Sequence, residues 1–307
     1  MWYIYFMKIC YGLMLSSKYE QVVRLIETLN VNDNQLVLLV DKKSEQLYQD
    51  LKKKYGNDKH IFFIEERFDV YWGGITTAEA AVSLMKNTLQ FDYDYFTMMS
   101  ESCLPLYPDE EIKAFLERHK GTEFIDCRFD WTKRSRLYLN HDKPYTAWQR
   151  KHRNILAFRD VVVDTLFGWA VGKNKRFKSH KVPTTLLWWS TTKECTRYMV
   201  ETIEKEDLIN AYRNTLIADE HIFAEVIYKS PYFDKLFVKL KRGGALLYCD
   251  WYTLNAPRLL TMKDYKKIYN PKYPCLYARK FDLKTQPEVV EKIYENRYNK
   301  EFKCPFK

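Results

Sequence analysis

Short apolar runs alternate with amphipathic helical stretches through the first 130 residues of this 307-residue chain. Ile9–Leu15 and Leu36–Val40 have the length and apolar character of buried strands, and Tyr19–Leu29 between them carries apolar residues on one helical face. The same alternation predicts helices over Ser44–Tyr55, Ala78–Leu89 and Asp109–Arg118, and strands over His60–Ile64, Tyr95–Met99 and Glu123–Cys127. Such alternation is typical of βαβ units around a mainly parallel sheet. We therefore predict the α/β class, with a Rossmann-like sheet flanked by helices.

The start of one helix has a local pattern of its own. Thr76 followed by Glu79 is a capping box, in which each side chain can bind a backbone N–H group of the first turn. The pair stands at the start of the apolar-periodic stretch Ala78–Leu89. This predicts that a helix begins there.

The regular alternation breaks after residue 130. Residues 131–181 form a basic and aromatic insertion, and alternation resumes in residues 182–307. In that last part, strands are predicted over Leu186–Trp189 and Leu246–Cys249, and helices over Lys193–Ile203, Ala218–Tyr228 and Pro287–Glu295. We expect a single domain, 1–307, built from these three parts.

The composition limits the partners and the compartment. Lys and Arg number 50 against 40 Asp and Glu, so the surface should attract anions such as nucleotides, acidic lipid headgroups or nucleic acid. The seven cysteines are odd in number, scattered, and never in a C-x-x-C pair. This argues against a disulfide framework or a zinc site and favours a reducing compartment. We expect a cytoplasmic protein.

Three short pieces near the carboxyl end supply one carboxylate and two separated cations. They are Ala218-Asp219-Glu220, Asp250-Trp251 with Pro257-Arg258 behind it, and the stretch Ala278–Asp282. A carboxylate can take the proton of an attacking hydroxyl, and Arg and Lys can hold the charge on a departing diphosphate. By itself each piece also has a structural reading, because acidic pairs cap helices and most cations are simply solvated.

Several segments together resemble the core-2/I-branching glycosyltransferases, glycosyltransferase family 14, a group that includes the peptide O-xylosyltransferases and bacterial members. Beside the three carboxyl-terminal pieces, the segments are Leu39–Lys43, Val70–Gly74, Ser100–Leu106 and Trp188-Trp189-Ser190. Their joint order and spacing carry the resemblance over roughly the whole chain.

The resemblance implies an enzyme with a GT-A-type fold, an inverting single displacement and no divalent metal or other cofactor. Residues 1–130 would be the nucleotide-binding half, and residues 182–307 the acceptor and catalytic half. The family motifs make Glu220 the general base, Arg258 and Lys280 the contacts to the donor diphosphate, and Asp41 a contact to the nucleoside.

Aromatic and polar residues near the expected ligand edge are candidate sugar contacts. Glu101 and Ser102 follow a predicted parallel strand, where ligands bind in such sheets. Trp72 could form the floor of a sugar or base site, or be a core residue beside a tight turn at Gly73-Gly74. Trp188 and Trp189 alternate on a strand, so one should face the core. We assign Trp189 to the acceptor groove.

The resemblance also implies a donor and an acceptor, although this chain departs from the family motifs at two places. Cys103 replaces the usual Asp of the Ser-x-x-Asp-x-Pro-Leu motif, and Thr185-Leu186 replaces a Gly-Ser pair. Both positions should lie near the sugars. We expect UDP-N-acetylglucosamine as donor, with UDP-xylose or UDP-galactose as alternatives, and a glycan or lipid-linked glycan as acceptor in surface polysaccharide synthesis.

Asp92-Tyr93-Asp94 has the Asp-x-Asp form that holds Mn²⁺ or Mg²⁺ in many nucleotide-sugar enzymes. It precedes the strand Tyr95–Met99, whereas ligand sites follow parallel strands. We interpret it as a surface turn and assign no residue to a metal.

Two surface readings stay open. An apolar run, Val161–Val171, precedes the basic cluster Lys173, Lys175, Arg176, Lys178 and Lys181. Most charge runs are solvated faces, but an apolar run beside one can also contact an anionic membrane, here the inner face of the cell membrane. The rival to an enzyme is a non-catalytic binder of nucleic acid or another anionic polymer; no recognisable nucleic-acid motif is present, so we expect no nucleic-acid partner.

Overall fold

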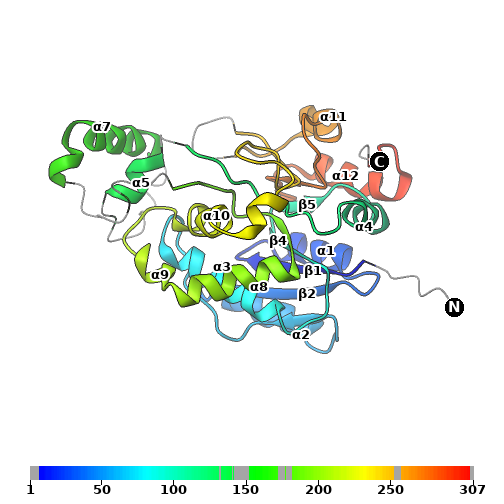
Figure 1. Ribbon diagram of the computed structural model, residues 1–307. Coiled ribbons are helices and arrows are strands. Elements are labelled where there is room, and N and C mark those ends of the chain that lie inside the picture. The colour runs from blue at the N-terminus through cyan, green and yellow to red at the C-terminus, as the bar shows by residue number, and fades with distance from the viewer. Residues whose placement is uncertain are drawn as a thin grey trace.

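The computed structural model describes residues 7–130, 133–139, 141, 152–171, 177, 182–251 and 257–304. Its centre is a five-stranded sheet with the order β3-β2-β1-β4-β6 (Figure 1). The strands are β1 (Ile9–Leu15), β2 (Gln35–Val40), β3 (Ile61–Phe63), β4 (Tyr95–Ser100) and β6 (Ser190–Thr192). All pairs are parallel except β4 with β6. The predicted mainly parallel α/β fold is confirmed.

Helices cover both faces of this sheet. On one face α1 (Tyr19–Leu29), α2 (Glu45–Tyr55) and α12 (Pro287–Asn299) pack on the odd-numbered side chains of β1. On the other face α3 (Ile75–Thr88), α8 (Lys193–Lys205) and α10 (Ile222–Tyr228) pack on Cys10 and Met14. Every residue of β1 is therefore buried, as expected of a central strand covered on two sides.

A close approach inside the core explains a glycine in this central strand. A Cβ atom on Gly12 would lie 2.5 Å from Cε2 of Phe96 in the neighbouring β4. A larger residue would push the Phe96 ring out of its place, so glycine lets β1 and β4 share this packed layer.

The predicted capping box is wrong. Helix α3 begins at Ile75, Gly74 is its N-cap, and no side chain caps it. The Thr76 hydroxyl instead accepts a hydrogen bond from Tyr71 N at 3.1 Å, and Glu79 pairs with Arg213 at 3.4 Å. The Thr76 hydroxyl is therefore bound to the turn at 70–74 and does not cap the helix.

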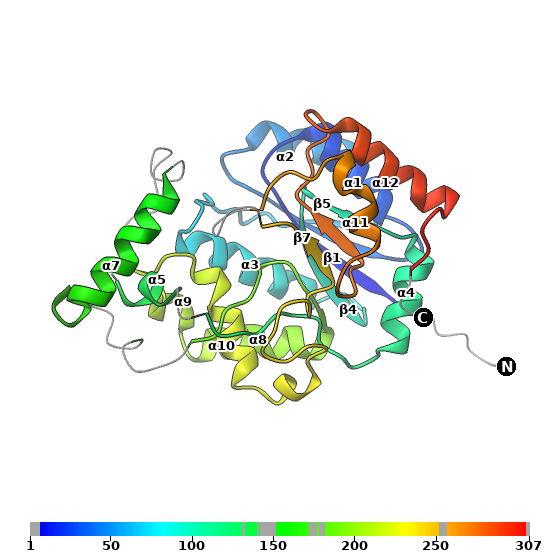
Figure 2. The same cartoon turned by 90° about the horizontal axis from the view of Figure 1, so that it is seen from above.

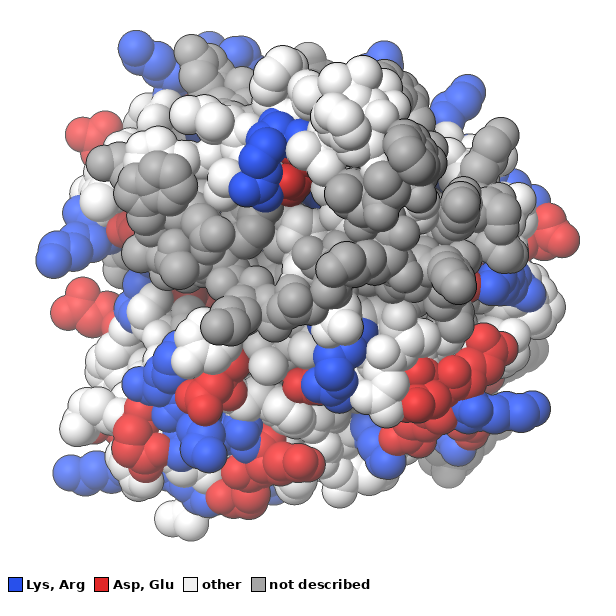
Figure 3. Space-filling model, turned by 90° about the vertical axis from the view of Figure 1, so that its left-hand side faces the viewer, with Lys and Arg blue, Asp and Glu red and all other residues white. Residues whose placement is uncertain are grey.

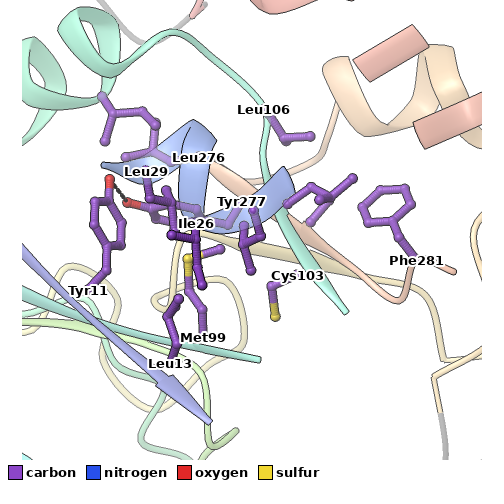
Figure 4. Packing of buried hydrophobic residues seen from close by; sticks show 14 of the residues in the cluster. Tyr11, Leu13, Ile26, Leu29, Met99, Cys103, Leu106, Leu276, Tyr277 and Phe281 are labelled. Carbon is purple, nitrogen blue, oxygen red and sulfur yellow. Dashed lines mark hydrogen bonds between the residues drawn. The ribbon is translucent and has the colours of Figure 1, made fainter. Parts of the chain in front are cut away.

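A second, three-stranded sheet with the order β5-β8-β7 stands beside the first. Its strands are β5 (Cys103–Pro105), β7 (Leu247–Cys249) and β8 (Tyr277–Arg279). One apolar cluster joins the two sheets, and the hydroxyls of Tyr11 in β1 and Tyr277 in β8 lie 3.4 Å apart within it (Figure 4). Because β5 follows β4 after only two residues, the second sheet starts at the carboxyl end of β4.

Some predicted elements of the second half have other bounds. The strand expected over Leu186–Trp189 begins at Ser190, and Glu123–Cys127 pairs only through isolated bridges of Glu123 and Phe124. The helix expected over Ala218–Tyr228 is a 3-10 turn, η3 (Ala218–Glu220), followed by α10. The remaining elements are α4 (Asp109–Arg118), α5 (Arg134–Tyr138), α7 (Arg153–Val171), α9 (Leu208–Ala211), η4 (Pro231–Lys235), η5 (Met262–Asp264) and α11 (Tyr265–Tyr269).

Helix α7 lies at one end of the molecule, away from the central sheet, in both views (Figures 1 and 2). It contains the whole apolar run Val161–Val171, whereas the basic cluster Lys173, Lys175, Arg176, Lys178 and Lys181 lies outside the described residues. Across the part of the chain that is described, no helix is both long and apolar enough to cross a membrane.

Candidate active site

The carboxyl ends of β1, β2 and β4 meet at one edge of the sheet and bring several predicted site residues there. Asp41 directly follows β2 and is 6% exposed. Its carboxylate accepts hydrogen bonds from the backbone N and from Nζ of Lys43, both at 2.9 Å. Asp41 is thus held in a fixed orientation at the ligand edge of the sheet.

Glu101 and Ser102 follow β4 at the same edge. The Glu101 carboxylate accepts a hydrogen bond from the Ser16 hydroxyl at 2.9 Å, which ties the loop after β1 to the loop after β4. Ser102 O accepts from Phe281 N at 3.0 Å. Both residues are buried, so in this structure they connect the loops at the edge of the sheet and are little exposed to solvent.

Arg258 lies at the matching end of the second sheet, where β7 and β8 run parallel. Its guanidinium binds two carboxylates: Nε donates to Asp250 Oδ2 at 3.0 Å, and Nη1 donates to Asp264 Oδ2 at 2.7 Å. The hydrogen bonds that Arg258 donates to Asp264, and also those to Asp250, raise the pKa of Arg258 above its usual value, although burial acts to lower it. Both partners constrain a side chain that the sequence assigned to a diphosphate.

Lys280 directly follows β8 and is half-buried. Its carbonyl accepts from Leu260 N at 2.9 Å, which places the segment after Arg258 beside it. The next residue, Phe281, binds Ser102. Arg258 and Lys280 therefore lie on adjoining segments, next to the carboxyl end of β4.

Glu220 closes η3, and neighbouring loops hold this turn in place. Ile217, with φ of 58°, donates to Gly73 O at 2.9 Å, so Trp72 lies next to the turn in the adjoining loop. Glu220 O accepts from Thr185 N at 2.7 Å. Trp72 is 36% exposed.

Two cations bind the Glu220 carboxylate. Lys133 Nζ lies 2.5 Å and Arg136 Nη1 lies 3.1 Å from the same oxygen, Oε2. Burial favours the neutral acid, but the charges of Lys133 and Arg136 outweigh it and hold the pKa of Glu220 at about 2. The carboxylate is ionised at neutral pH, and it is a weak base as long as both cations stay bound.

The pKa values of the two residues beside Glu220 are shifted in opposite directions. Burial, together with the charge of Glu220, raises the pKa of Asp219 to about 7. Burial also lowers the pKa of His221 to about 3, and its Nδ1 lies 3.0 Å from Pro183 O. Neighbouring carboxylic acids with pKa values pushed far apart are typical of acid–base sites, although structural ion pairs produce them too.

Trp189 requires a correction. Its side chain is 1% exposed and packs on Phe223 with ring centroids 4.8 Å apart, so it belongs to the core and cannot line an open groove. Trp188 is the partner that points the other way: it is half-buried, and the Arg279 guanidinium lies 4.7 Å from its ring centroid. Strand alternation predicted that one of the pair faces the core, and the buried residue is Trp189, the one that was assigned to the acceptor groove.

Sequence reasoning missed Lys133 and Arg136. They are three residues apart at α5, inside the insertion that was described only as basic and aromatic. Nothing in their local pattern distinguishes them from solvated cations, because their partner Glu220 is 87 and 84 positions away. The local signal is their spacing of three, which puts two cations on one helical face but does not identify Glu220 as their partner.

Asp92-Tyr93-Asp94 lies at the amino end of β4, opposite to the ligand edge. Lys8 Nζ pairs with Asp92 at 2.6 Å, and Lys8 N donates to Asp94 at 2.8 Å. Asp92 is 84% exposed at its side chain. The two carboxylates thus lie in the segment before β4 and bind Lys8, whereas Tyr93 between them is buried.

Comparison with known proteins shows which protein family this chain matches. Residues 9–272 match the family model described as Core-2/I-Branching enzyme. Xylosyltransferase 2 of Rattus norvegicus is 21% identical over 307 residues, covering 92% of this chain and 33% of that protein. Xylosyltransferase 1 of Homo sapiens is 19% identical over 292 residues, covering 89% and 28%. The chain thus spans about a third of the length of the curated relatives it matches.

Among solved structures, the apo form of mouse xyloside xylosyltransferase 1 is similar over 88% of this chain and 97% of that one. The sequence identity is 12% and the TM-score is 0.35, so this likeness adds nothing to what the family match establishes.

Proposed function

The chain belongs to the Core-2/I-Branching enzyme family, and we propose that it transfers a sugar from a UDP-sugar to an acceptor hydroxyl with inversion at the anomeric carbon. The observation that carries the proposal is Glu220, an ionised carboxylate fixed between two cations beside the ligand edge of a parallel sheet. The family motif makes this residue the base, and the geometry supports its ionised state.

In the proposed reaction Glu220 takes the proton of the acceptor hydroxyl. The hydroxyl oxygen forms a bond to the anomeric carbon as the bond from that carbon to the diphosphate oxygen breaks on the opposite face. UDP leaves with the bonding electrons. For Glu220 to be an effective base, the acceptor must share or displace the contacts to Lys133 and Arg136, because a pKa of about 2 leaves little tendency to accept a proton.

Arg258 and Lys280 would balance the charge that develops on the leaving UDP. Arg258 already binds Asp250 and Asp264, so a diphosphate must replace one of them. Asp264 is buried and completes a capping box with Thr261, whereas the Asp250 side chain is 32% exposed. Asp250 is therefore the partner that a diphosphate would replace. Two side-chain cations can supply the charge that a divalent metal supplies elsewhere.

Asp41 would contact the nucleoside, and Trp72, Glu101 and Ser102 would contact the sugars. Asp41 follows β2 and Glu101 follows β4, the two strands that flank β1 at the ligand edge, and Trp72 adjoins the Glu220 turn. We leave Trp189 out of this set because its ring packs on Phe223 in the core.

Two donors have separate support. The motifs of the chain favour UDP-N-acetylglucosamine, whereas the named relatives are xylosyltransferases and favour UDP-xylose. The acceptor we propose is a glycan or a lipid-linked glycan of a surface polysaccharide. All seven cysteines are unpaired, six of them buried, which supports a reducing compartment such as the cytoplasm.

Ligand titration followed by thermal unfolding tests the proposal. UDP, and at least one of UDP-N-acetylglucosamine, UDP-xylose and UDP-galactose, should raise the Tm in a concentration-dependent way. The stabilising UDP-sugar should then release UDP when glycan acceptors are added. If a single-stranded oligonucleotide stabilises the protein and UDP does not, the rival role as an anionic-polymer binder replaces this one.

A further inference from the structure

The inner face of helix α7 packs against the residues that precede the Glu220 turn. Leu156 is 7% exposed and forms a small apolar cluster with Leu216 and Ile217, the residues just before the Glu220 turn. Asp160, one turn further along α7, is also buried and accepts a hydrogen bond from Arg159 Nη2 at 2.5 Å. α7 also packs on α5, which carries Arg136. The helix therefore lies directly behind the segments that hold Glu220.

The outer face of α7 is apolar too. Ile155, Phe158 and Leu166 are 67%, 73% and 59% exposed, and the partly exposed Val162 lies between the last two. Spacings of three, four and four residues place these four on one stripe along about 17 Å of helix. A surface helix of a globular protein normally turns charged and polar residues outward. An exposed apolar stripe of this length indicates a surface that something else covers.

The chain that follows α7 is strongly basic. Residues 172–181 include Lys173, Lys175, Arg176, Lys178 and Lys181 and contain no Asp or Glu. In the sequence, Lys173 comes only two residues after Val171, the last residue of α7. An apolar helix face with adjoining Lys and Arg is the combination that binds an anionic membrane surface.

We propose that the outer face of α7, defined by Ile155, Phe158, Val162 and Leu166, docks the protein on the surface of an anionic membrane. The cations that follow it supply attraction to acidic headgroups, and the apolar side chains enter the boundary between headgroups and acyl chains. The helix lies on the membrane and does not cross it, in line with the hydropathy of the described helices.

The view of the molecule from the α7 end fits this orientation. The Asp, Glu, Lys and Arg residues that are described gather mainly over the lower part of this face, whereas α7 lies in the upper part (Figures 1 and 3). Docking through α7 would keep that charged surface in water. It would also place the Glu220 turn, which packs behind Leu156, close to acceptors that are presented at the membrane.

Vesicle flotation tests the proposal with the full chain. The protein should float with phosphatidylcholine vesicles that contain phosphatidylglycerol, should not float with phosphatidylcholine alone, and should be released by high salt. The double variant F158S/L166S should bind anionic vesicles at least about tenfold more weakly, because two large apolar side chains no longer enter the lipid. The matched control is Tyr298→Ser, which changes an 85% exposed aromatic residue on α12 and should float like the unchanged protein.

The controls separate this proposal from the enzymatic one. F158S/L166S should keep the thermal shift given by UDP, which shows that it is folded and that nucleotide binding is independent of docking. Flotation with both kinds of vesicle alike, with neither, or equally well by the double variant would overturn membrane docking. So would a dimer in light scattering that F158S/L166S dissociates, because a second copy of the chain would then be the occupant of this face.

Discussion

Lys133 Nζ lies 2.5 Å from Oε2 of Glu220, and this contact ties the reactivity of the proposed base to a residue from the insertion. A carboxylate held by a cation is ionised but reluctant to accept a proton. The Lys133–Glu220 pair therefore determines both the charge state of Glu220 and the conditions under which it can act.

Lys133→Met should move the acid side of the pH profile of kcat/KM to higher pH. Burial alone would raise the pKa of Glu220, and Lys133 is the largest of the charges that hold it near 2. Without it the carboxylate becomes protonated at higher pH. The measurement is the rate of UDP release across the acidic range. Lys86→Met, which removes an exposed cation paired with Glu204, should leave the profile unchanged; the same profile in both variants would show that Lys133 does not control Glu220.

Asp219→Asn should remove part of the pH dependence of stability. Burial and the charge of Glu220 raise the pKa of Asp219 from 3.8 to about 7, so folding favours its protonated form. Its contribution to stability is complete below pH 3.8 and is lost as the pH rises through 7. Thermal unfolding in a pH series should show the unchanged protein losing Tm, relative to the Asn variant, as the pH rises through that range. Parallel Tm curves for the two proteins would mean that Asp219 is ionised in the fold.

Arg258→Ala should weaken the binding of UDP by about tenfold or more, because a charge-assisted contact to the diphosphate is lost. Asp250→Asn should bind UDP at least as tightly as the unchanged protein, because the competing carboxylate charge is gone. Asp264→Asn should weaken binding by loosening the guanidinium that Asp264 orients. Isothermal calorimetry separates the three variants. If Arg258→Ala binds UDP normally while remaining folded, Arg258 serves only to hold its two carboxylates.

Transfer should continue in the presence of EDTA. Both carboxylates of Asp92-Tyr93-Asp94 bind Lys8 at the far end of β4, and the cations Arg258 and Lys280 lie at the ligand edge. Asp92→Asn should likewise keep full activity, since this side chain is exposed and distant from that edge. The contrary result is transfer that strictly requires Mn²⁺ and that Asp92→Asn abolishes. Asp92-Tyr93-Asp94 would then be a metal site, and Arg258 and Lys280 would not replace a metal ion.

Much of the fold could be predicted from periodicity. The strands Ile9–Leu15 and Leu36–Val40 and the helix Tyr19–Leu29 match β1, β2 and α1 to within a residue at each end, because a strand buried on two sides and a helix buried on one leave unambiguous patterns. The capping box failed because local spacing could not show that Thr76 is engaged by the preceding turn, through Tyr71 N.

The site was less accessible to sequence reasoning, because its electrostatics depend on contacts between distant segments. Alternation predicted that Trp188 and Trp189 face opposite ways but could not say which one faces the core. Trp189 is buried because its ring packs on Phe223 of α10. The two cations on Glu220 come from a segment whose pattern is irregular. The motif Ala218-Asp219-Glu220 located the carboxylate, and only the tertiary contacts show what holds it.

The most direct test of the account is Glu220→Gln, measured for transfer and for UDP binding in the same preparation. We predict that transfer falls by about 10²–10⁴-fold, the usual worth of a general base, while the Kd for UDP stays nearly unchanged. The control Glu79→Gln, a carboxylate on α3 that pairs with Arg213, should retain transfer. Transfer by Glu220→Gln at the rate of the unchanged protein would contradict the account, because the chemistry would then need a different base.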